Sequence, residues 1–343
     1  MILQAAIREL TEGRDLGREQ MRAAMQAIMT GEASGAQIGG FLVALRMKGE
    51  TVTEIAAAVE VMRELATPVP TISTSVVLKL LSTGTGGDAS GLFNVSTASS
   101  FVVAAAGGHV AKHGNRAVSG KSGAADVLEA AGVALNLSPE AVAQCVRELG
   151  VGFMFAPAFH SAMKHAIGPR KEMAVRTVFN LLGPLTNPAG APNQLIGVFD
   201  RQWLRPLAEV LRELGSRHVM LVHSDDGLDE ISCAETTHYC ELKDGEISSG
   251  SISPKDFGMT PASLQAIQVA DAQQSLEMVR AALGNQPGAA RSIVTLNAGA
   301  ALYLAGQAAD LAGGVELAQE TLASGQAIEK LEALAALSRK LAA

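Results

Sequence analysis

The chain has 343 residues, of which 48% are hydrophobic and 18% charged; this length predicts two domains or one large α/β unit with an appendage. The 27 basic and 34 acidic residues give a net charge of −7, which argues against broad electrostatic binding of nucleic acid and leaves room for a local basic pocket. Three cysteines without metal-ligand spacing predict reduced thiols in a cytoplasmic protein, and no apolar stretch reaches the ~20 residues that a membrane span requires.

Residues 2–66 predict a helical subdomain. Apolar residues recur there at intervals of three and four, so we expect four short helices, the last two capped by Ser34 and Thr53. Pro68 and Pro70 then end the helix, since each proline disfavours helical geometry in the residue before it. We therefore expect a first domain of residues 1–70, joined by helices from about 158–185, and a second domain of residues 71–343.

Short apolar runs alternate with helical patterns beyond this boundary. Helices are expected near residues 95–106, 138–149 and 202–214, and a hairpin near 239–252 with Asp244-Gly245 at its turn. This alternation is typical of βαβ units and predicts a larger α/β domain with a mostly parallel central sheet flanked by helices. The strand candidates are residues 76–81, 109–112, 151–155, 194–199 and 218–223.

A glycine-rich loop from Ser82 to Asp88 follows the first strand candidate. Its glycines let the backbone approach a bulky anion. Asn94, Ser96 and Thr97 open the next helix, where hydroxyl and N–H groups can donate to phosphate oxygens. The pattern favours a phosphate-binding loop, with a tight strand-to-helix turn as the alternative.

A second loop, Lys112 to Ser122, carries three cations and a histidine after its own strand candidate. Five residues rather than four separate Gly114 from Gly120, which argues against a P-loop NTPase. A cationic loop at the carboxyl edge of a parallel sheet lies where open α/β folds bind ligands. A solvated charged loop is the alternative.

Two further segments carry candidate site residues. The acidic run Asp225 to Glu230 follows a strand candidate, and adjacent acids at a strand end suit Mg²⁺, although an exposed acidic turn gives the same pattern. His160 and His165 are five residues apart and do not share a helix face as a zinc-binding pair would. The Gly-Pro and Asn-Pro pairs between residues 168 and 188 predict an ordered connection.

These four segments, in this order, resemble the anthranilate phosphoribosyltransferase family, which shares its fold with pyrimidine nucleoside phosphorylases. The resemblance rests on GTGGD, NVSTA, KHGNRAVSGKSGAADVLEA, VRTVFNLLGPLTNP and DGLDE, and it runs from the N-terminal helices almost to Ala343. Ser224, where the family more often has glycine, is a departure that affects the local turn geometry. The resemblance implies a Mg-dependent pentosyltransferase of tryptophan biosynthesis, which transfers the phosphoribosyl group of 5-phosphoribosyl-1-pyrophosphate to the amine of anthranilate and releases pyrophosphate.

The resemblance also implies the site residues. No residue is expected to act as an obligatory base, because the aromatic amine is neutral near pH 7; His113 and Arg170 would position the acceptor. Two Mg²⁺ ions per subunit would be held by Asp229, Glu230 and Ser96. Anthranilate would contact Gly84, His113, Asn115, His160, Arg170 and Pro184. The phosphoribosyl donor would contact Gly84, Gly87, Asp88, Asn94, Ser96, Thr97, Lys112 and Ser119.

Two other functions are compatible with parts of the sequence. A pyrimidine nucleoside phosphorylase would use the same fold and a phosphate loop, but it would not need the tandem acids Asp229 and Glu230. A nucleic-acid-binding relative would need a basic surface stripe that a net charge of −7 hardly supplies. For the enzyme we expect a homodimer through the helical subdomain, because that subdomain carries closely spaced apolar residues: Ile38, Phe41, Leu42, Leu45 and Met47.

Overall fold

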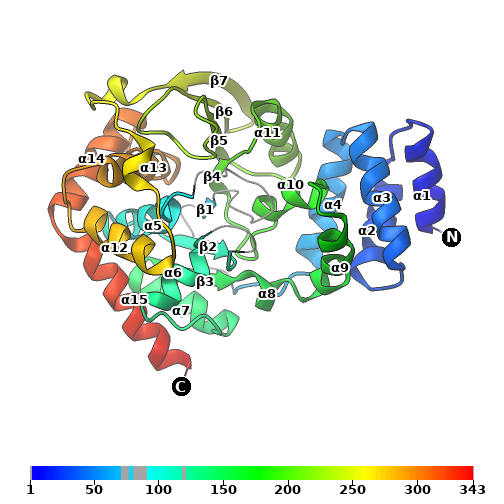
Figure 1. Cartoon of the computed structure of the whole chain (residues 1–343), viewed down its shortest axis with the longest axis horizontal. Coiled ribbons are helices and arrows are strands. Elements are labelled where there is room, and N and C mark those ends of the chain that lie inside the picture. Colours follow the sequence, from blue (N-terminus) through cyan, green and yellow to red (C-terminus); the bar gives the residue numbers. More distant parts are fainter. Residues whose placement is uncertain (1, 71–76, 80–90, 118–120, 343) are drawn as a thin grey trace.

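The computed structural model describes residues 2–70, 77–79, 91–117 and 121–342 (Figure 1). Its N-terminal part is helical, as predicted, and consists of α1 (Ile2–Thr11), α2 (Arg18–Met29), α3 (Gly35–Lys48) and α4 (Val52–Glu64). Within the described residues, no helix is both long and apolar enough to cross a membrane. The three cysteines are free and buried.

The N-cap of α4 differs from the prediction. Helix α3 begins after Ser34, as expected, but α4 begins after Thr51 and not after Thr53. The Thr51 hydroxyl accepts the Glu54 N–H, and the Glu54 carboxylate accepts the Thr51 N–H in return. This reciprocal capping box needs an acceptor three residues after the cap. Thr53 has Ala56 at that position, so it lies inside the helix.

Glu54 also holds the helical part together through a buried charge. Its side chain is fully buried, accepts the Leu16 N–H at 2.8 Å and lies 2.8 Å from Lys48 Nζ. Lys48 also contacts the exposed Asp15 at 2.6 Å. A buried carboxylate is tolerated only when its oxygens are paired and hydrogen-bonded. The loop before α2, the end of α3 and the start of α4 are therefore joined at one point.

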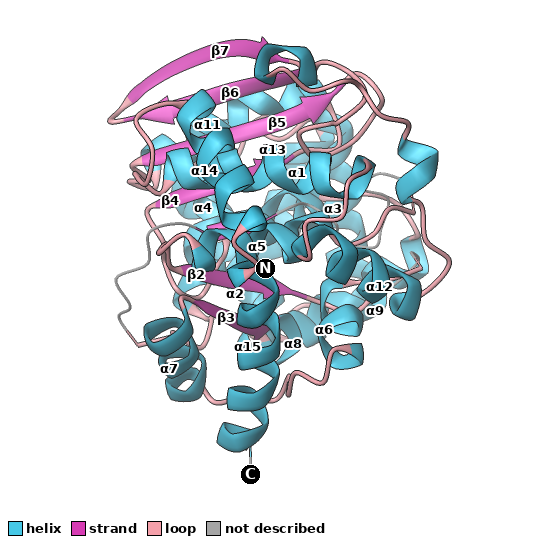
Figure 2. Ribbon diagram, turned by 90° about the vertical axis from the view of Figure 1, so that its left-hand side faces the viewer, coloured by secondary structure: helices cyan, strands magenta, loops and turns pink. Residues whose placement is uncertain are grey.

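The larger part of the chain is built on parallel strands extended by a hairpin. β1 (Val77–Lys79), β4 (Asn193–Gly197) and β5 (His218–Ser224) run parallel, and β6 (Thr237–Lys243) and β7 (Glu246–Ile252) continue the same sheet antiparallel. A second ladder pairs β2 (Val110–Gly114) with β3 (Val151–Phe155) in parallel. In Figure 2 the strands follow one another from β7 at the top to β3 near the bottom.

The predicted strands and hairpin are confirmed. Each of the five strand candidates coincides with a strand, although residues 76, 80 and 81 lie outside the described residues. Asp244 and Gly245 both have positive φ, 48° and 92°, as the tight turn of a two-residue hairpin requires. The sheet is mixed because this hairpin adds two antiparallel strands at one edge.

Helices cover both faces of the sheet (Figures 1 and 2). Side chains of β4 and β5 alternate between the faces. Leu195 and Met220 pack in a core with α5 and α13, whereas Ile196 and Leu221 pack in a second core with α11, α10 and the helical part. The helices are α5 (Val95–Ala105), α6 (Ala124–Ala130), α7 (Pro139–Leu149), α8 (Ala156–Phe159), α9 (Lys164–Met173), α10 (Val178–Leu185), α11 (Leu204–Glu213), α12 (Ala272–Leu283), α13 (Ala289–Leu304), α14 (Leu311–Ala323) and α15 (Gln326–Ala342).

The second core crosses from the N-terminal helices to the sheet. Helix α9 contacts α2 and α3, and α10 contacts α3 and α4. Helix α11 contacts both α4 and the strands β5 and β6. The division of the chain at residue 70, with residues from about 158–185 joining the first domain, stays a prediction.

Candidate active site

A lysine, a serine and an acidic residue meet where β2, α5 and the loop after β5 come together. Lys112, on β2, is buried, and its Nζ donates to Ser96 Oγ of α5 at 2.8 Å. Burial lowers the pKa of Lys112 to about 8, while the nearby Glu230 carboxylate acts in the opposite direction. Desolvation disfavours the charged amine, and a neighbouring anion supports it. The structure thus places Lys112 so that it interacts with two other predicted site residues, Ser96 and Glu230.

The start of α5 supplies further polar groups to this place. Asn94 stands at the N-cap, and its Oδ1 accepts the hydroxyls of Ser122 at 3.0 Å and Ser275 at 2.8 Å. The Thr97 hydroxyl is buried and has no hydrogen-bond partner among the described residues. A buried polar atom without a partner is costly, and a phosphate oxygen would satisfy it. A helix N-terminus also favours an anion.

The four acids after β5 fall into two pairs with different surroundings. Asp229 and Glu230 are 2% and 8% exposed, respectively. Asp225 is 54% exposed at its side chain and contacts His238 at 2.9 Å, and Asp226 accepts the Ser232 hydroxyl at 2.5 Å. An exposed acidic turn therefore does not describe Asp229 and Glu230.

The chemistry of this buried pair fits Mg²⁺. Within the described residues, no group of three or more His, Cys, Asp or Glu side chains could hold a metal ion by itself. Mg²⁺ is usually bound through one or two carboxylates, with waters and substrate phosphates completing its octahedron. Asp229 and Glu230 supply such a partial set of hard oxygen ligands.

The predicted acceptor residues lie on several elements. The rings of His113 on β2 and His160 after α8 are both buried, 4.8 Å apart between centroids and inclined at 57°. Arg170 on α9 stacks over Phe179 at 5.1 Å, and burial lowers the pKa of its guanidinium. Pro184 is buried within α10, while the exposed Asn115 accepts the Arg116 N–H at 2.7 Å. The structure thus brings the two predicted histidines into contact with each other.

Four of the predicted site residues lie outside the described residues: Gly84, Gly87, Asp88 and Ser119. Arg116, one of the cations of the second loop, has its partners within the fold. It forms a two-pronged ion pair with Glu129 at 2.5 and 2.9 Å and stacks over Phe155 at 5.7 Å.

Sequence reasoning missed the residue that seats the acidic loop on the sheet. Gly197 ends β4, and a Cβ added there would lie 1.5 Å from Asp229 O. Only glycine permits so close an approach of two backbones. The sequence signal, a glycine at the end of an apolar strand, is too common to identify it alone.

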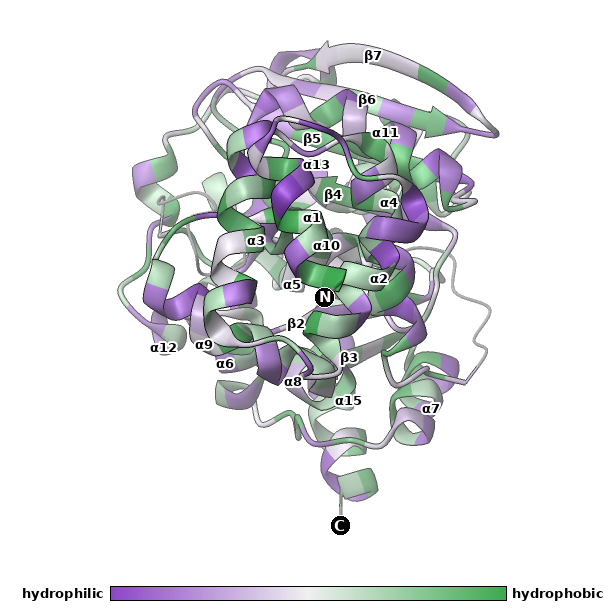
Figure 3. Cartoon of the chain, turned by 90° about the vertical axis from the view of Figure 1, so that its right-hand side faces the viewer, coloured by the Kyte–Doolittle hydropathy of each residue, from purple (hydrophilic) through white to green (hydrophobic). Residues whose placement is uncertain are grey.

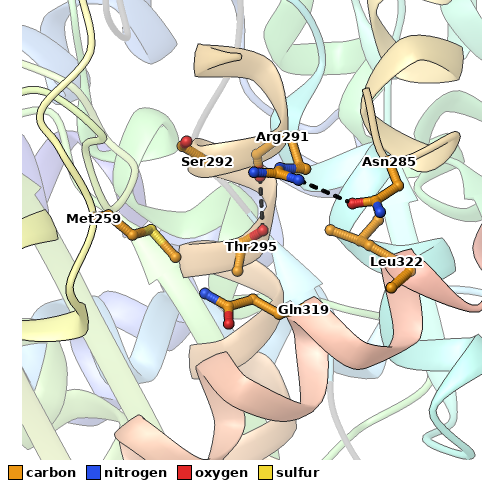
Figure 4. Close-up of a pocket in the computed structure, with 8 residues that line it drawn as sticks. Met259, Asn285, Arg291, Ser292, Thr295, Gln319 and Leu322 are labelled. Atoms are coloured by element: carbon orange, nitrogen blue, oxygen red, sulfur yellow. Dashed lines mark hydrogen bonds between the residues drawn. The ribbon is translucent and has the colours of Figure 1, made fainter. Parts of the chain in front are cut away.

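A separate cavity of about 340 Å³ lies at α13 and α14 (Figure 4). Arg291 donates to Asn285 there at 3.3 Å, and the Thr295 hydroxyl donates to Arg291 O at 2.8 Å. None of the residues that line it is among the predicted site residues: Met259, Asn285, Arg291, Ser292, Thr295, Gln319, Leu322 and Ala323. The buried charges around Lys112 therefore remain the candidate active site.

The lowered pKa of Lys112 has a measurable consequence for the protein without substrate or divalent metal. The pKa is about 8 when folded against an ordinary value of 10.5, so between these pH values the unfolded chain binds more protons. The free energy of unfolding contributed by this residue should therefore rise with pH across that window. Relative to Lys112→Met, the wild type should gain about 3 kcal/mol, measured by denaturant titration at a series of pH values. Parallel pH profiles for the two proteins would show that Lys112 titrates normally.

Known proteins cover the chain almost end to end. The glycosyl transferase family, helical bundle domain, matches residues 4–66, and the glycosyl transferase family, a/b domain, matches residues 80–328. Anthranilate phosphoribosyltransferase of Thioalkalivibrio sulfidiphilus is 61% identical, covering 97% of this chain and 98% of the relative. That of Cellvibrio japonicus is 56% identical, covering 99% and 100%.

Solved structures agree with this result. The crystal structure of anthranilate phosphoribosyltransferase from Thermus thermophilus is 42% identical with a TM-score of 0.90, covering 97% of this chain and 99% of that one. The Saccharomyces cerevisiae enzyme in complex with PRPP and Mg has the same fold at 24% identity, with a TM-score of 0.87 and 98% of each chain covered. The two matching domains and these identities show that the chain belongs to the anthranilate phosphoribosyltransferase family.

Proposed function

We propose that the protein transfers the phosphoribosyl group of 5-phosphoribosyl-1-pyrophosphate to the amine of anthranilate and releases pyrophosphate, as a cytoplasmic step of tryptophan biosynthesis. The observation that carries the proposal is the burial of Lys112, Ser96 and the acids Asp229 and Glu230 in one place. Cation, hydroxyl and carboxylate groups of this kind suit a substrate with several phosphates and a magnesium ion.

The donor is assigned to the start of α5 and the loops beside it. Lys112 contributes a charge, and Asn94, Ser96 and Thr97 contribute polar groups at the helix N-terminus. An ion-paired phosphate would restore the charged form of Lys112, which burial disfavours. Gly84, Gly87, Asp88 and Ser119 complete the proposed donor set on the strength of the family resemblance.

Two Mg²⁺ ions per subunit are part of the proposal, held by Asp229, Glu230 and Ser96. When bound, Mg²⁺ neutralises charge on the leaving pyrophosphate. The support is the burial of two adjacent carboxylates beside the proposed donor site. Burial disfavours a charged carboxylate, and a bound cation favours it.

The reaction needs no covalent intermediate with the protein. The bond between ribose C1 and the pyrophosphate oxygen breaks with its electron pair going to pyrophosphate, while the anthranilate nitrogen forms the new bond to C1 and afterwards loses a proton. Lys112 holds the leaving group, and His113, Asn115, His160, Arg170 and Pro184 hold the acceptor. Positioning and electrostatic stabilisation of this sort account for large rate accelerations. The neutral amine requires no obligatory base.

The subunits are proposed to form a homodimer through the helical part. The sequence argument for a dimer was wrong for four of its five residues, because Ile38, Phe41, Leu42 and Leu45 are buried within the helical part itself and only Met47 is exposed. The support comes instead from the large hydrophobic side chains that are exposed in the described residues, which all lie on α1, α3, α9 or just after α9: Ile2, Val43, Met47, Ile167 and Val175. Figure 3 views the molecule from this side. Clustering of exposed apolar groups on one side is typical of an association surface. Sedimentation equilibrium at micromolar concentration should give twice the monomer mass; a monomer would contradict the proposal.

The metal assignment is tested with Asp229→Asn and Glu230→Gln together, which keep size and remove both charges. In the wild type, the decrease of anthranilate fluorescence should require both donor and Mg²⁺. The rate of this decrease should be at least about 100-fold lower in the double variant. Because both acids are buried, the thermal midpoint is measured alongside. Asp225→Asn, an exposed acid of the same turn, is the control and should keep its rate. Near-normal turnover of the double variant at limiting Mg²⁺ would contradict the assignment.

Arg170 separates the proposed acceptor site from a general phosphoribosyl-binding site. A guanidinium can hold the carboxylate of anthranilate through two parallel hydrogen bonds and so aim its amine. Arg170→Ala should raise KM for anthranilate about tenfold to a hundredfold with little change in KM for the donor, and Arg170→Lys should restore part of the loss. Arg176→Ala is the control, since Arg176 also stacks over a phenylalanine, Phe199, at 4.4 Å. Equal effects on both constants would remove Arg170 from the acceptor site.

A further inference from the structure

Side chains from other elements of the fold form hydrogen bonds with the main chain at and just after the two buried acids. We propose that Ser224, Thr237 and Asn297 are positioning residues, which hold Asp229 and Glu230 in the geometry that binds metal and donor. The inference rests on the proposed function for the role of the two acids. It adds three residues that touch neither substrate nor metal and act through the backbone of residues 230–232.

Asn297 holds the residue that follows the acidic pair. It lies on α13 and is fully buried. Its Nδ2 donates to Ile231 O at 2.9 Å, and its Oδ1 accepts the Ile231 N–H at 3.0 Å. Nδ2 also donates to Ile293 O within α13 at 2.9 Å. The amide group therefore fixes both main-chain polar groups of Ile231 to a long helix.

Ser224 and Thr237 hold the residues on either side of Ile231. The Ser224 hydroxyl donates to Glu230 O at 2.7 Å. Ser224 and Thr237 Oγ atoms are 2.6 Å apart, and Thr237 accepts the Ser232 N–H at 3.0 Å. Since the one hydroxyl proton of Ser224 is used on Glu230, the Thr237 hydroxyl must donate to Ser224. The hydrogen bonds therefore form one chain, from the Ser232 N–H through the Thr237 and Ser224 hydroxyls to Glu230 O. Both hydroxyl side chains are fully buried.

The backbone of Asp229 is fixed by contact rather than by hydrogen bonding. Its carbonyl oxygen lies where a Cβ of Gly197 would be, with only 1.5 Å between them. Residues 229–232 are therefore seated against β4 and tied to β5, β6 and α13. The side chain at position 224, at which the sequence departs from the family pattern, is a member of this set.

Holding the backbone matters because its position decides where the two carboxylates stand. Asp229 and Glu230 are adjacent and buried, and Glu230 also lies near the charge of Lys112, so a shift of this backbone would change the placement of both acids at once. Metal ligation requires oxygens placed within about 0.5 Å, and partners of ligands commonly change metal affinity 10–100-fold when removed. Three buried polar side chains that end on this one stretch of backbone supply that restraint.

Helix α13 offers a matched control. Thr295 is buried as well, but its hydroxyl donates to Arg291 O within the same helix, as Figure 4 shows. Residues two apart on a helix point in nearly opposite directions, so Thr295 faces the cavity at α14 while Asn297 faces the acidic loop. Thr295→Val therefore removes a buried hydroxyl of α13 without touching residues 229–232.

The experiment measures donor binding without turnover. Calorimetric titration with 5-phosphoribosyl-1-pyrophosphate, in Mg²⁺ and without anthranilate, is done for wild type, Ser224→Ala, Asn297→Leu and Thr295→Val. We expect Kd for the donor to rise about tenfold in the first two variants and to stay within twofold in Thr295→Val. In steady state, KM for the donor and the half-saturating Mg²⁺ should rise in parallel, with KM for anthranilate unchanged.

The outcomes separate this inference from the proposed function. Ser224→Ala removes one oxygen atom and keeps the inference testable if Asn297→Leu does not fold. Wild-type donor affinity in Ser224→Ala, or equal weakening in Thr295→Val, overturns the positioning role. Asp229→Asn is titrated beside them: loss of donor affinity there with no loss in Ser224→Ala overturns the inference alone, whereas unchanged affinity in Asp229→Asn overturns the proposed metal site and this inference with it.

Discussion

The attraction between Lys112 and Glu230 is the interaction around which the candidate site is arranged. Both side chains are buried, and Glu230 supports the charge of Lys112, yet burial still brings the pKa of the lysine down to about 8. For Lys112 this attraction therefore does not offset the cost of desolvation, as is common for buried charges. The remaining structure must hold these groups in place, and the anionic groups of a substrate would favour the charged lysine.

The two cores of the protein explain how this arrangement is kept rigid. Alternate residues of β4 and β5 face α5 and α13 on one side and α11 with the N-terminal helices on the other. The strands are thus fixed from both faces, and the loop that follows β5 inherits their position. Gly197 then lets that loop lie directly on the end of β4. Burial of apolar side chains on both faces holds the backbone of these strands in place. The backbone in turn determines where the charged side chains of the site lie.

The sequence was sufficient for most elements but not for the surroundings of the site. Period-two and helical patterns are local, so the strands near residues 110, 151, 194 and 218 and the Asp244-Gly245 turn could be predicted from neighbouring residues alone. Burial of Asp229 depends on contacts that local patterns do not contain: Asn297 is 66 residues from Ile231 in sequence. The capping box at Thr51 was local and could have been found, because Glu54 stands at the required spacing.

The partners of the basic side chains distinguish those that stabilise the fold from those that are available to a ligand. Arg18 and Arg116 are hydrogen-bonded to Glu60 and Glu129, and these bonds raise the pKa of each guanidinium. Burial instead lowers the pKa of Lys112, Arg170 and Arg63. Arg63 donates to Leu185 O at the end of α10, where a helix carboxyl terminus favours a cation. Lys112 has the Ser96 hydroxyl and the nearby Glu230 carboxylate, and Arg170 has an aromatic face. Burial still lowers the pKa of both side chains, so both cations gain from an anionic ligand.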